Sequence, residues 1–390
     1  MKIIHINDKT TLSGGVEVYI QSLLPLLREQ GLEAHWISVG ISEGKAWIES
    51  ESENWHGNSV SLESSPLMRW IDEQTVLHVH SLSEPKLIRQ LCRMAPVVRH
   101  MHDPRMLCPG QGKFWAAEEN KCELPFGAHC ILHAYTKRCC NRHPLNLAKQ
   151  YVATHFEVNE ASTQYSAVIT NSNWMHNEAL KVGYPPKTLH QLCYFTEIVP
   201  APRTKPLQPR VVYTGRLSKT KGVHYLLHAM SQVLRSLPNA TLDILGSGHD
   251  EAEIRQLATS LRIDSATTFH GWADRTTVHE IVSKASVVAF PSIYPEAFGI
   301  SGIEAMMRGK PVVGFNVGGV SDWLKDGETG IVATLKNSSS LANGLTKILS
   351  DDNVRNRLGS AARKIAIARF SPSIHLGELI HIYANGTRAT

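Results

Sequence analysis

Short apolar runs alternate with longer amphipathic stretches along nearly all of the 390 residues, and this alternation constrains the fold more than any other feature. The apolar runs lie at 2–6, 34–39, 76–80, 96–101 and 167–171, and again at 211–215, 240–245, 266–270, 286–290 and 311–315. Such alternation is typical of parallel β-sheets covered by helices. The chain is too long for one ordinary hydrophobic core. We therefore predict an α/β protein with two doubly wound domains.

A proline-rich segment interrupts the pattern between these two sets of strands. Residues 196–209 contain four prolines in fourteen residues and are predicted to be a linker. The predicted domains are residues 1–195 and residues 210–371, and residues 338–386 are predicted to be helical. Ligands often bind in a cleft between two domains, so we expect the site there. The alternative is an α/β protein with two unrelated domains and a site within one of them.

Composition and charge narrow the class of protein. The charged fraction of 19% and the hydrophobic fraction of 42% are those of a globular protein, neither disordered nor membrane-spanning. Residues 1–200 carry 18 Lys and Arg against 20 Asp and Glu (−2), whereas residues 201–390 carry 22 against 15 (+7). A basic second half suits a small phosphate-bearing ligand, and its scattered charges do not indicate nucleic acid. Met1 leads directly into an apolar run, so we expect a cytoplasmic protein with reduced cysteines.

Two glutamates lie eight positions apart in the run Pro-Glu-Ala-Phe-Gly-Ile-Ser-Gly-Ile-Glu, residues 295–304. Glu296 is predicted to lie on a strand-to-helix loop, and Glu304 about two turns into the following helix. In open α/β sheets this kind of loop lies at the carboxyl ends of the strands, where ligands bind. A glycine-bearing loop that opens a helix also offers free N–H groups to an anion. The segment is therefore predicted to hold a polyhydroxylated, negatively charged ligand.

A second motif supplies cations. The run Gly-Arg-Leu-Ser-Lys-Thr-Lys-Gly, residues 215–222, follows a predicted strand and opens a helix. Arg216 and Lys221 could bind the same anion, Arg216 with its two-pronged guanidinium and Lys221 as a point charge. The run lacks the Gly-x4-Gly-Lys-Ser/Thr of a P-loop, and Gly246-Ser-Gly248 lacks the third glycine of a dinucleotide fingerprint. Two solvated surface cations are the alternative interpretation.

Together these motifs resemble the family 4 retaining glycosyltransferases (glycosyl transferases group 1), which have the GT-B fold. The resemblance rests on strand–Gly-Arg-x4-Lys-Gly, on the glutamate pair about 75 residues later, and on Gly318-Gly319. It implies two Rossmann-like domains facing each other across a cleft. It also implies that the closing helix, residues 372–390, packs back on the N-terminal domain. One departure is Asp322, which stands where the family usually has glutamate; we assign it no role.

The resemblance implies roles for residues of the second half. Arg216 and Lys221, after Gly215, would hold the nucleotide diphosphate and stabilise its charge as the glycosidic bond breaks, so no metal or other cofactor is required. Glu304 would bind ribose hydroxyls and Glu296 hydroxyls of the donor sugar. Backbone N–H groups of Phe298, Gly299 and Ile300 would bind the sugar or phosphates. The base would lie near Gly271 and Trp272.

The first half also matches the family at two places. Gly14 and Gly15 resemble its glycine-rich loop after the first strand, where Gly15 would let the backbone approach a phosphate closely. His102, followed by Asp103, resembles its active-site histidine and would contact the donor sugar near the reacting carbon. Each of these residues also has an ordinary structural interpretation, a turn glycine or a histidine at a strand end.

A segment that we name the cysteine insert, residues about 105–149, contains five cysteines within 33 residues: Cys108, Cys122, Cys130, Cys139 and Cys140. Their spacing matches no standard zinc pattern, so a structural metal, a disulfide and free thiols all stay open. Trp115, Phe126 and the basic residues of the insert could contact a lipid-linked acceptor and an anionic membrane surface. Solvated positive charge is the alternative.

The sequence thus predicts a retaining glycosyltransferase that moves a sugar from a nucleotide-diphosphate sugar to a hydroxyl. The expected acceptor is a lipid-linked glycan of surface polysaccharide assembly, reached from the inner face of the plasma membrane. Two alternatives stay open. Nucleotide-sugar epimerases share the fold, and they would isomerise the donor without acceptor. A binding scaffold without catalysis would tolerate loss of Lys221.

Overall fold

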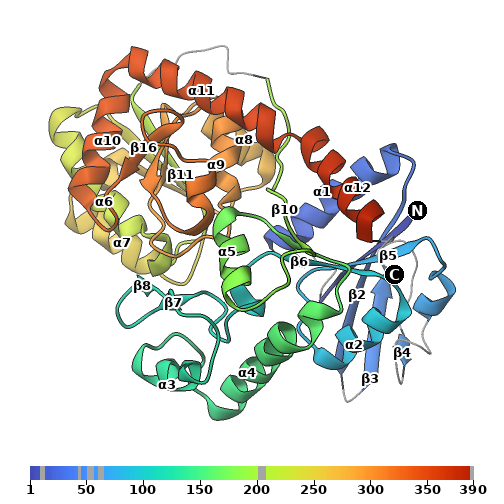
Figure 1. The fold of residues 1–390 in the computed structure, drawn as a ribbon. Coiled ribbons are helices and arrows are strands. Elements are labelled where there is room, and N and C mark those ends of the chain that lie inside the picture. Colours follow the sequence, from blue (N-terminus) through green and yellow to red (C-terminus); the bar gives the residue numbers. More distant parts are fainter. Residues whose placement is uncertain (9–13, 43–44, 51–56, 60–65, 201–207, 387–390) are drawn as a thin grey trace. The chain divides into compact units, whose positions relative to one another are not determined.

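A computed structural model describes residues 1–8, 14–42, 45–50, 57–59, 66–200 and 208–386 (Figure 1). The chain divides into two compact units. Unit 1 comprises Met1–Glu118, Cys122–Cys193 and His375–Thr390, and unit 2 comprises Glu119–Lys121 and Tyr194–Ile374. Residues 201–207 of the predicted linker lie outside the described residues.

Unit 1 is built on an eight-stranded sheet with the order β10-β9-β6-β5-β1-β2-β3-β4. Strands from β10 to β2 are parallel, and β3 and β4 extend the sheet antiparallel. The strands are β1 (Lys2–Asn7), β2 (Glu33–Ser42), β3 (Lys45–Ser50), β4 (Gly57–Ser59), β5 (Thr75–Val79), β6 (Val97–Met101), β9 (Ala167–Thr170) and β10 (Leu189–Gln191). All residues of β5, β6 and β9 are buried, as expected for central parallel strands covered on both faces.

The helices of unit 1 follow the predicted apolar spacing. Helix α1 (Gly15–Glu29) buries Ile20, Leu23, Leu24 and Leu27 on one stripe. The others are α2 (Pro85–Met94), α3 (His129–Thr136), α4 (Pro144–Asn159), α5 (Asn173–Lys181) and α12 (Pro372–Gly386). From His375 onward α12 belongs to unit 1, where Tyr383 is fully buried. The cysteine insert also contains a two-stranded sheet of β7 (Phe114–Trp115) and β8 (Asn120–Lys121).

Unit 2 is a six-stranded parallel sheet with the order β13-β12-β11-β14-β15-β16. Its strands are β11 (Arg210–Thr214), β12 (Thr241–Leu245), β13 (Thr267–Gly271), β14 (Val287–Phe290), β15 (Val312–Phe315) and β16 (Gly330–Ala333). Its helices are α6 (Val223–Ser236), α7 (Glu251–Ser260), α8 (Arg275–Ser283), α9 (Ile300–Met307), α10 (Ser338–Ser350) and α11 (Asp352–Phe370), and α6 packs against α10. The chain runs from β11 outward to β12 and β13, then returns to β14. The β11–β14 boundary is thus the topological switch point, where ligands of open α/β sheets bind.

The prediction of two parallel-sheet α/β units is confirmed, and each of the ten predicted strands is present. The strands β3, β4, β7, β8, β10 and β16 were not predicted from the sequence. Within the described ranges, no helix combines the length and apolar character needed to cross a bilayer.

Candidate functional site

The site predicted in unit 2 is built on two loops at the carboxyl ends of adjacent strands. One loop, residues 215–222, follows β11, and the other, residues 291–299, follows β14. The loops are packed backbone to backbone. Gly222 has a φ of +68°, and a Cβ there would lie 2.0 Å from the carbonyl oxygen of Pro291. A glycine is required at this contact because a side chain could not fit.

Lys221 and Glu296 meet across these loops. The Lys221 ammonium donates to Glu296 Oε1 over 2.6 Å, and the Ser292 hydroxyl donates to the same oxygen over 2.6 Å. The Lys221 side chain is 22% exposed and that of Glu296 11% exposed, so the pair is only partly in contact with solvent. The backbone of Glu296 is also fixed, because the Gly319 N–H donates to the Glu296 carbonyl over 2.7 Å. The two residues that the sequence analysis chose from separate motifs therefore form one charged pair.

Arg216 lies beside this pair and is exposed. The Tyr213 hydroxyl donates to the Arg216 carbonyl over 2.9 Å. Burial raises the pKa of Tyr213, the Glu296 carboxylate raises it further, and the Arg216 guanidinium opposes both. Tyr213 is therefore near enough to Glu296 and Arg216 for both charges to act on its pKa. Among the residues that the structure describes, the Arg216 side chain has no ion-pair partner, whereas Lys221 is paired with Glu296. The Arg216 charge is therefore available to a ligand.

The N-terminus of α9 follows the loop after β14 and is the third part of the site in unit 2. Gly299 caps the helix with a φ of +93°, and a Cβ there would lie 2.8 Å from the Phe290 ring. Phe298 is buried, and its carbonyl accepts from the Trp323 indole N–H over 2.7 Å. The Gly302 N–H donates to the Gly299 carbonyl over 3.0 Å. Helix geometry leaves the N–H groups of Ile300 and Ser301 without carbonyl partners in the helix, so these two are suited to bind an anion.

The structure corrects the predicted position of Glu304. Helix α9 begins at Ile300, so Glu304 lies about one turn into the helix and not two. Its side chain is half-buried, and burial raises its pKa while Arg308 opposes this shift. The prediction was wrong about the distance because the loop after β14 extends to Gly299.

Gly271 is the last residue of β13, two strands away from β11, and Trp272 follows it. Gly271 has a φ of +68°, and its carbonyl accepts from the Gly246 N–H over 2.7 Å. The Trp272 side chain is 78% exposed, which is unusual for so large an apolar group. An exposed indole at a carboxyl edge offers a flat surface on which a base could stack.

In unit 1, Gly14 and Gly15 lie at the start of α1, with Gly14 as the N-cap. A Cβ at Gly14 would lie 2.9 Å from Glu17 Oε2, whereas a Cβ at Gly15 would meet nothing within 4 Å. No packing contact among the described residues therefore requires glycine at position 15.

His102 belongs to a group of buried histidines that the sequence analysis missed. His5 lies on β1, His78 and His80 lie on and just after β5, and His100 and His102 lie on and just after β6. These three strands are adjacent and parallel, and alternate residues of a strand point to one face. The detectable signal was the His-x-His spacing, present twice at the ends of predicted strands.

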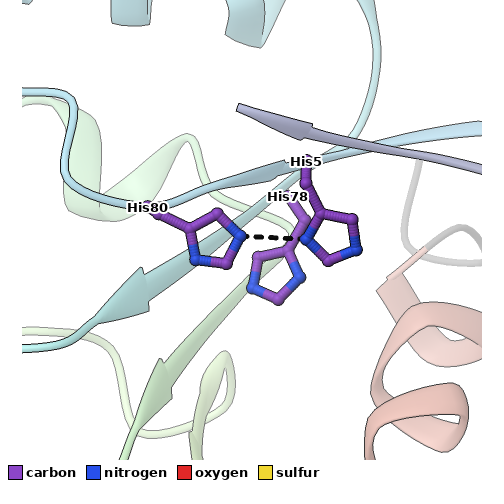
Figure 2. A group of neighbouring side chains, drawn as sticks. All are labelled: His5, His78 and His80. Carbon is purple, nitrogen blue, oxygen red and sulfur yellow. Dashed lines mark hydrogen bonds between the residues drawn. The ribbon is translucent and has the colours of Figure 1, made fainter. Parts of the chain in front are cut away.

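The rings pair with one another through their nitrogens. Figure 2 shows a hydrogen bond between His5 and His80, with the His78 ring alongside. His5 Nδ1 lies 2.9 Å from His80 Nε2. His80 Nδ1 in turn lies 2.8 Å from His102 Nε2. The Tyr383 hydroxyl of α12 lies 2.6 Å from His78 Nδ1. The His102 ring is therefore oriented by His80, and His80 in turn by His5.

A sixth histidine, His375 of α12, joins this group through Tyr19. Its Nε2 lies 2.8 Å from the Tyr19 hydroxyl, and its Nδ1 lies 2.7 Å from the Cys193 carbonyl, to which it can donate. We name His5, His78, His80, His100, His102 and His375 the histidine cluster.

Burial keeps the histidine cluster uncharged. It lowers the pKa of His5 and His102 to about 3 and that of His375 to about 4. The pKa values of the other three are also lowered well below 6.5, first by burial and then by neighbouring imidazoles. At neutral pH His102 is therefore a neutral hydrogen-bonding group. The nitrogens of His5, His78 and His80, and those of His80, His100 and His102, lie within 4.8 Å of one another, a spacing that could hold a metal ion.

Part of unit 2 is similar to a known protein family. Residues 195–365 match the model of the family "Glycosyl transferases group 1". An uncharacterized glycosyltransferase from Methanocaldococcus jannaschii is 34% identical over 173 residues, which cover 44% of this chain and 44% of that protein. The chain thus spans less than half the length of this relative. The alpha-D-kanosaminyltransferase of Streptomyces kanamyceticus is 24% identical over 66% of this chain and 70% of that protein.

A solved structure, Alr3699/HepE of Anabaena in complex with UDP and glucose, has a TM-score of 0.66 and 20% identity. The match covers 98% of this chain and 99% of that one. A likeness at this identity shows the fold, and the fold is GT-B.

Proposed function

We propose that this chain, whose residues 195–365 match the model of the glycosyl transferases group 1, is a retaining glycosyltransferase using a nucleotide-diphosphate sugar. The observation that carries the proposal is the Lys221–Glu296 pair, flanked by Arg216 and the N-terminus of α9. Cations, helix N–H groups and a carboxylate converge at the switch point of one sheet. A diphosphate linked to a sugar needs this combination, since its phosphates are anionic and its sugar offers hydroxyl donors.

In the proposed reaction, an acceptor hydroxyl attacks the anomeric carbon on the face from which the diphosphate departs. The glycosidic C–O bond breaks, and the departing diphosphate oxygen takes the acceptor proton. Arg216 and Lys221 stabilise the charge that develops on the diphosphate, and Glu296 binds hydroxyls of the sugar. Glu304 binds the ribose, and Trp272 stacks on the base. His102 contributes a neutral hydrogen bond near the reacting carbon, consistent with its lowered pKa.

The acceptor proposed here is a lipid-linked glycan of surface polysaccharide assembly, met at the inner face of the plasma membrane. Exposed apolar side chains in and beside the cysteine insert support this, among them Leu132 at 63% and Leu145 at 75% exposure. Basic residues accompany them in the same segment. This combination is suited to an amphiphilic acceptor with anionic headgroups.

A thermal-shift screen against UDP, GDP and ADP and their sugars tests the proposal. A ligand at 100 times its dissociation constant should stabilise the protein by about 2.7 kcal/mol, so at least one nucleotide diphosphate should raise the unfolding temperature. No shift with any nucleotide would overturn the proposal. The best donor is then incubated without acceptor. Isomerised donor would identify an epimerase, and donor bound without any turnover on added glycans would identify a scaffold.

Gly15 provides a second test, because no contact with the part of the chain that the structure describes requires a glycine there. A Cβ at position 15 has open space, and α1 should tolerate or favour alanine. We expect Gly15→Ala to unfold at the same or a slightly higher temperature, yet to lose at least about tenfold in donor turnover, a loss of ~1.4 kcal/mol. Gly377→Ala in α12 is the matched control, since a Cβ there also meets nothing within 4 Å. Equal activity of both variants would remove Gly15 from the donor site.

A further inference from the structure

Five histidines occupy positions of the unit 1 sheet where apolar side chains usually pack. They lie on or just after β1, β5 and β6 and are buried: His5, His78, His80, His100 and His102. Central parallel strands that are covered on both faces are normally rich in Val, Ile and Leu. Burying the polar nitrogens of imidazole is less favourable than burying those side chains. Packing alone therefore does not account for histidines at these positions.

Two groups of three rings have nitrogens close enough to share one metal ion. They are His5, His78 and His80, and His80, His100 and His102, and in each group one nitrogen of every ring lies within 4.8 Å of the others. The described part of the cysteine insert supplies no such group of three. Imidazole nitrogens suit Zn²⁺ and similar divalent transition-metal ions. A metal ion in this part of the chain would therefore be bound by histidines.

The first group is held on two central strands of the sheet. His5 of β1 lies opposite His78 of β5, because the two strands pair in parallel with these residues in register. His80 follows two positions after His78, so both side chains point to the same face. All three rings are fully buried, and Figure 2 shows them gathered around the hydrogen bond between His5 and His80. Side chains on packed strands are positioned precisely enough to serve as metal ligands.

The spacing within this group is near that of a bound ion. His5 Nδ1 and His80 Nε2 lie 2.9 Å apart. Two nitrogens bound at about 2.0–2.1 Å to one tetrahedral Zn²⁺ lie about 3.3 Å apart. An outward movement of a few tenths of an ångström would thus let an ion replace the proton that the two rings share.

The second nitrogens of two of these rings are already held by other side chains. His80 Nδ1 lies 2.8 Å from His102 Nε2, and His78 Nδ1 lies 2.6 Å from the Tyr383 hydroxyl. Histidines that bind a metal through one nitrogen usually donate the N–H of the other to a fixed acceptor, which sets the tautomer and the ring orientation. His78 and His80 are therefore arranged as metal ligands are.

A buried carboxylate lies on the same side of the sheet as the group. Asn7 follows His5 by two residues on β1, so their side chains point to the same face. Asn7 Nδ2 donates to Oε1 of the buried Glu17 over 2.9 Å, and Asn7 Oδ1 accepts from the Ser81 N–H over 3.1 Å. Glu17 thus supplies a negative charge that partly offsets the charge of a divalent ion.

Two of the three arginines whose charges act on the cluster are paired with carboxylates. Arg99 binds Glu157 over 2.6 Å, and Arg105 binds Asp103 over 2.7 Å. The third is Arg28. Its charge and that of the buried carboxylate of α1 have opposite signs, so the described arginines do not leave a large excess of positive charge.

We propose that His5, His78 and His80 bind one divalent transition-metal ion, such as Zn²⁺, in unit 1. Three histidine ligands leave the fourth position of a tetrahedral ion to water. The ion would fix the His80 ring, whose Nδ1–H would then donate to His102 Nε2. This effect on His102 matters for sugar transfer only if the proposed function holds, whereas metal binding itself does not depend on that function.

Metal analysis of the full chain, purified without a polyhistidine tag and dialysed at pH 7.5 after addition of Zn²⁺, tests the proposal. We expect about one zinc per chain, and His5→Leu should lose it. His100→Leu is the matched control, since it removes another fully buried histidine of the cluster and should keep the metal. Circular dichroism shows whether each variant is folded.

Three outcomes of this measurement would overturn the proposal. The first is a wild-type chain that retains no zinc. The second is zinc retained by a folded His5→Leu variant. The third is zinc lost by a folded His100→Leu variant, which would place the ion in the second group of histidines. Zinc bound by a chain that binds no nucleotide would support this proposal and contradict only the proposed function.

X-ray absorption at the zinc edge uses the wild-type chain alone, in case the variants do not fold. We expect nitrogen neighbours at about 2.0–2.1 Å from the zinc, together with the outer-shell scattering of about three imidazole rings. A shell of sulfur at about 2.3 Å would place the ion on cysteines and overturn the proposal. A shell of oxygen without imidazole scattering would also overturn it.

Discussion

Lys221→Met is expected to reduce sugar transfer by about 10²- to 10³-fold, because removing one charge-stabilising donor at a reacting centre costs about 3–4 kcal/mol. In the proposed mechanism Lys221 stabilises the departing diphosphate, so the loss should lie mainly in kcat. Donor turnover is measured as release of nucleoside diphosphate, with kcat and KM determined separately. Lys219→Met is the matched control, since Lys219 is exposed and lies two positions earlier in the same loop.

A substitution at Lys221 also affects Glu296, because the two side chains form an ion pair. The two side chains are bound to each other at 2.6 Å and largely buried, so removing Lys221 also leaves Glu296 without its counter-ion. A variant could then fail through local misfolding. Glu296→Gln and the double variant Lys221→Met/Glu296→Gln separate the two effects. If Lys221 acts on the diphosphate, the double variant stays inactive while its unfolding temperature recovers. Activity restored in the double variant would show that the pair is only structural.

The contribution of Arg216 is distinct from that of Lys221. Arg216 is exposed and follows the end of β11, whereas Lys221 is already neutralised by a carboxylate. A ligand diphosphate entering this site would meet the free charge of Arg216 first and would then share Lys221 with Glu296. In the proposed mechanism, donor binding would shift Lys221 from Glu296 toward the diphosphate, and this would couple the binding of phosphate to the binding of the sugar.

The sequence predicted most of this arrangement because its signals are local. Apolar runs identified the central strands, and the glycine-bearing loops that follow β11 and β14 identified Lys221 and Glu296 separately. The pairing of these two residues could not be predicted, since they are 75 positions apart and meet only because β11 and β14 are neighbours. Strand order is set by tertiary packing and not by local pattern. The position of Glu304 was wrong for a related reason, since loop length after a strand has no clear sequence signal.

The histidine cluster was missed for a different reason. Histidine is a polar residue, and five of them lie on or just after β1, β5 and β6, so they add nothing to the apolar pattern that predicts these strands. Only the sheet, which places β1, β5 and β6 side by side, brings their rings together. His102 was found because of its resemblance to a family motif, whereas its neighbours carried no such signal.

The histidine cluster leads to the second large expected effect, a steep loss of stability in mild acid. The folded pKa values are lowered, to about 3 for His5 and His102 and about 4 for His375, while unfolded histidines titrate near 6.5. Below pH 6.5 the unfolded chain therefore binds more protons than the folded chain, and stability falls as pH decreases toward 4. The charged side chains that act on these pKa values, Arg28 on His5 and Arg99 and Arg105 on His102, are positive and lower them further.

Below pH 6.5 each histidine lowers the free energy of unfolding by about 1.4 kcal/mol for each unit that the pH falls, so six lower it by up to about 8 kcal/mol per unit. The total free energy of unfolding of a protein is typically only about 5–15 kcal/mol. Unit 1 should thus unfold near pH 5.

Urea unfolding at pH 7.5, 6.5 and 5.5, followed by circular dichroism, gives the number of protons taken up on unfolding. His100→Leu should reduce that number by about one whatever its effect on overall stability, because a leucine cannot titrate. His249→Gln, which alters a histidine whose side chain is 78% exposed, should leave the number unchanged. Stability that stays constant between pH 7.5 and 5.5 would show that the cluster takes up protons without unfolding, so that its rings are not held neutral by burial.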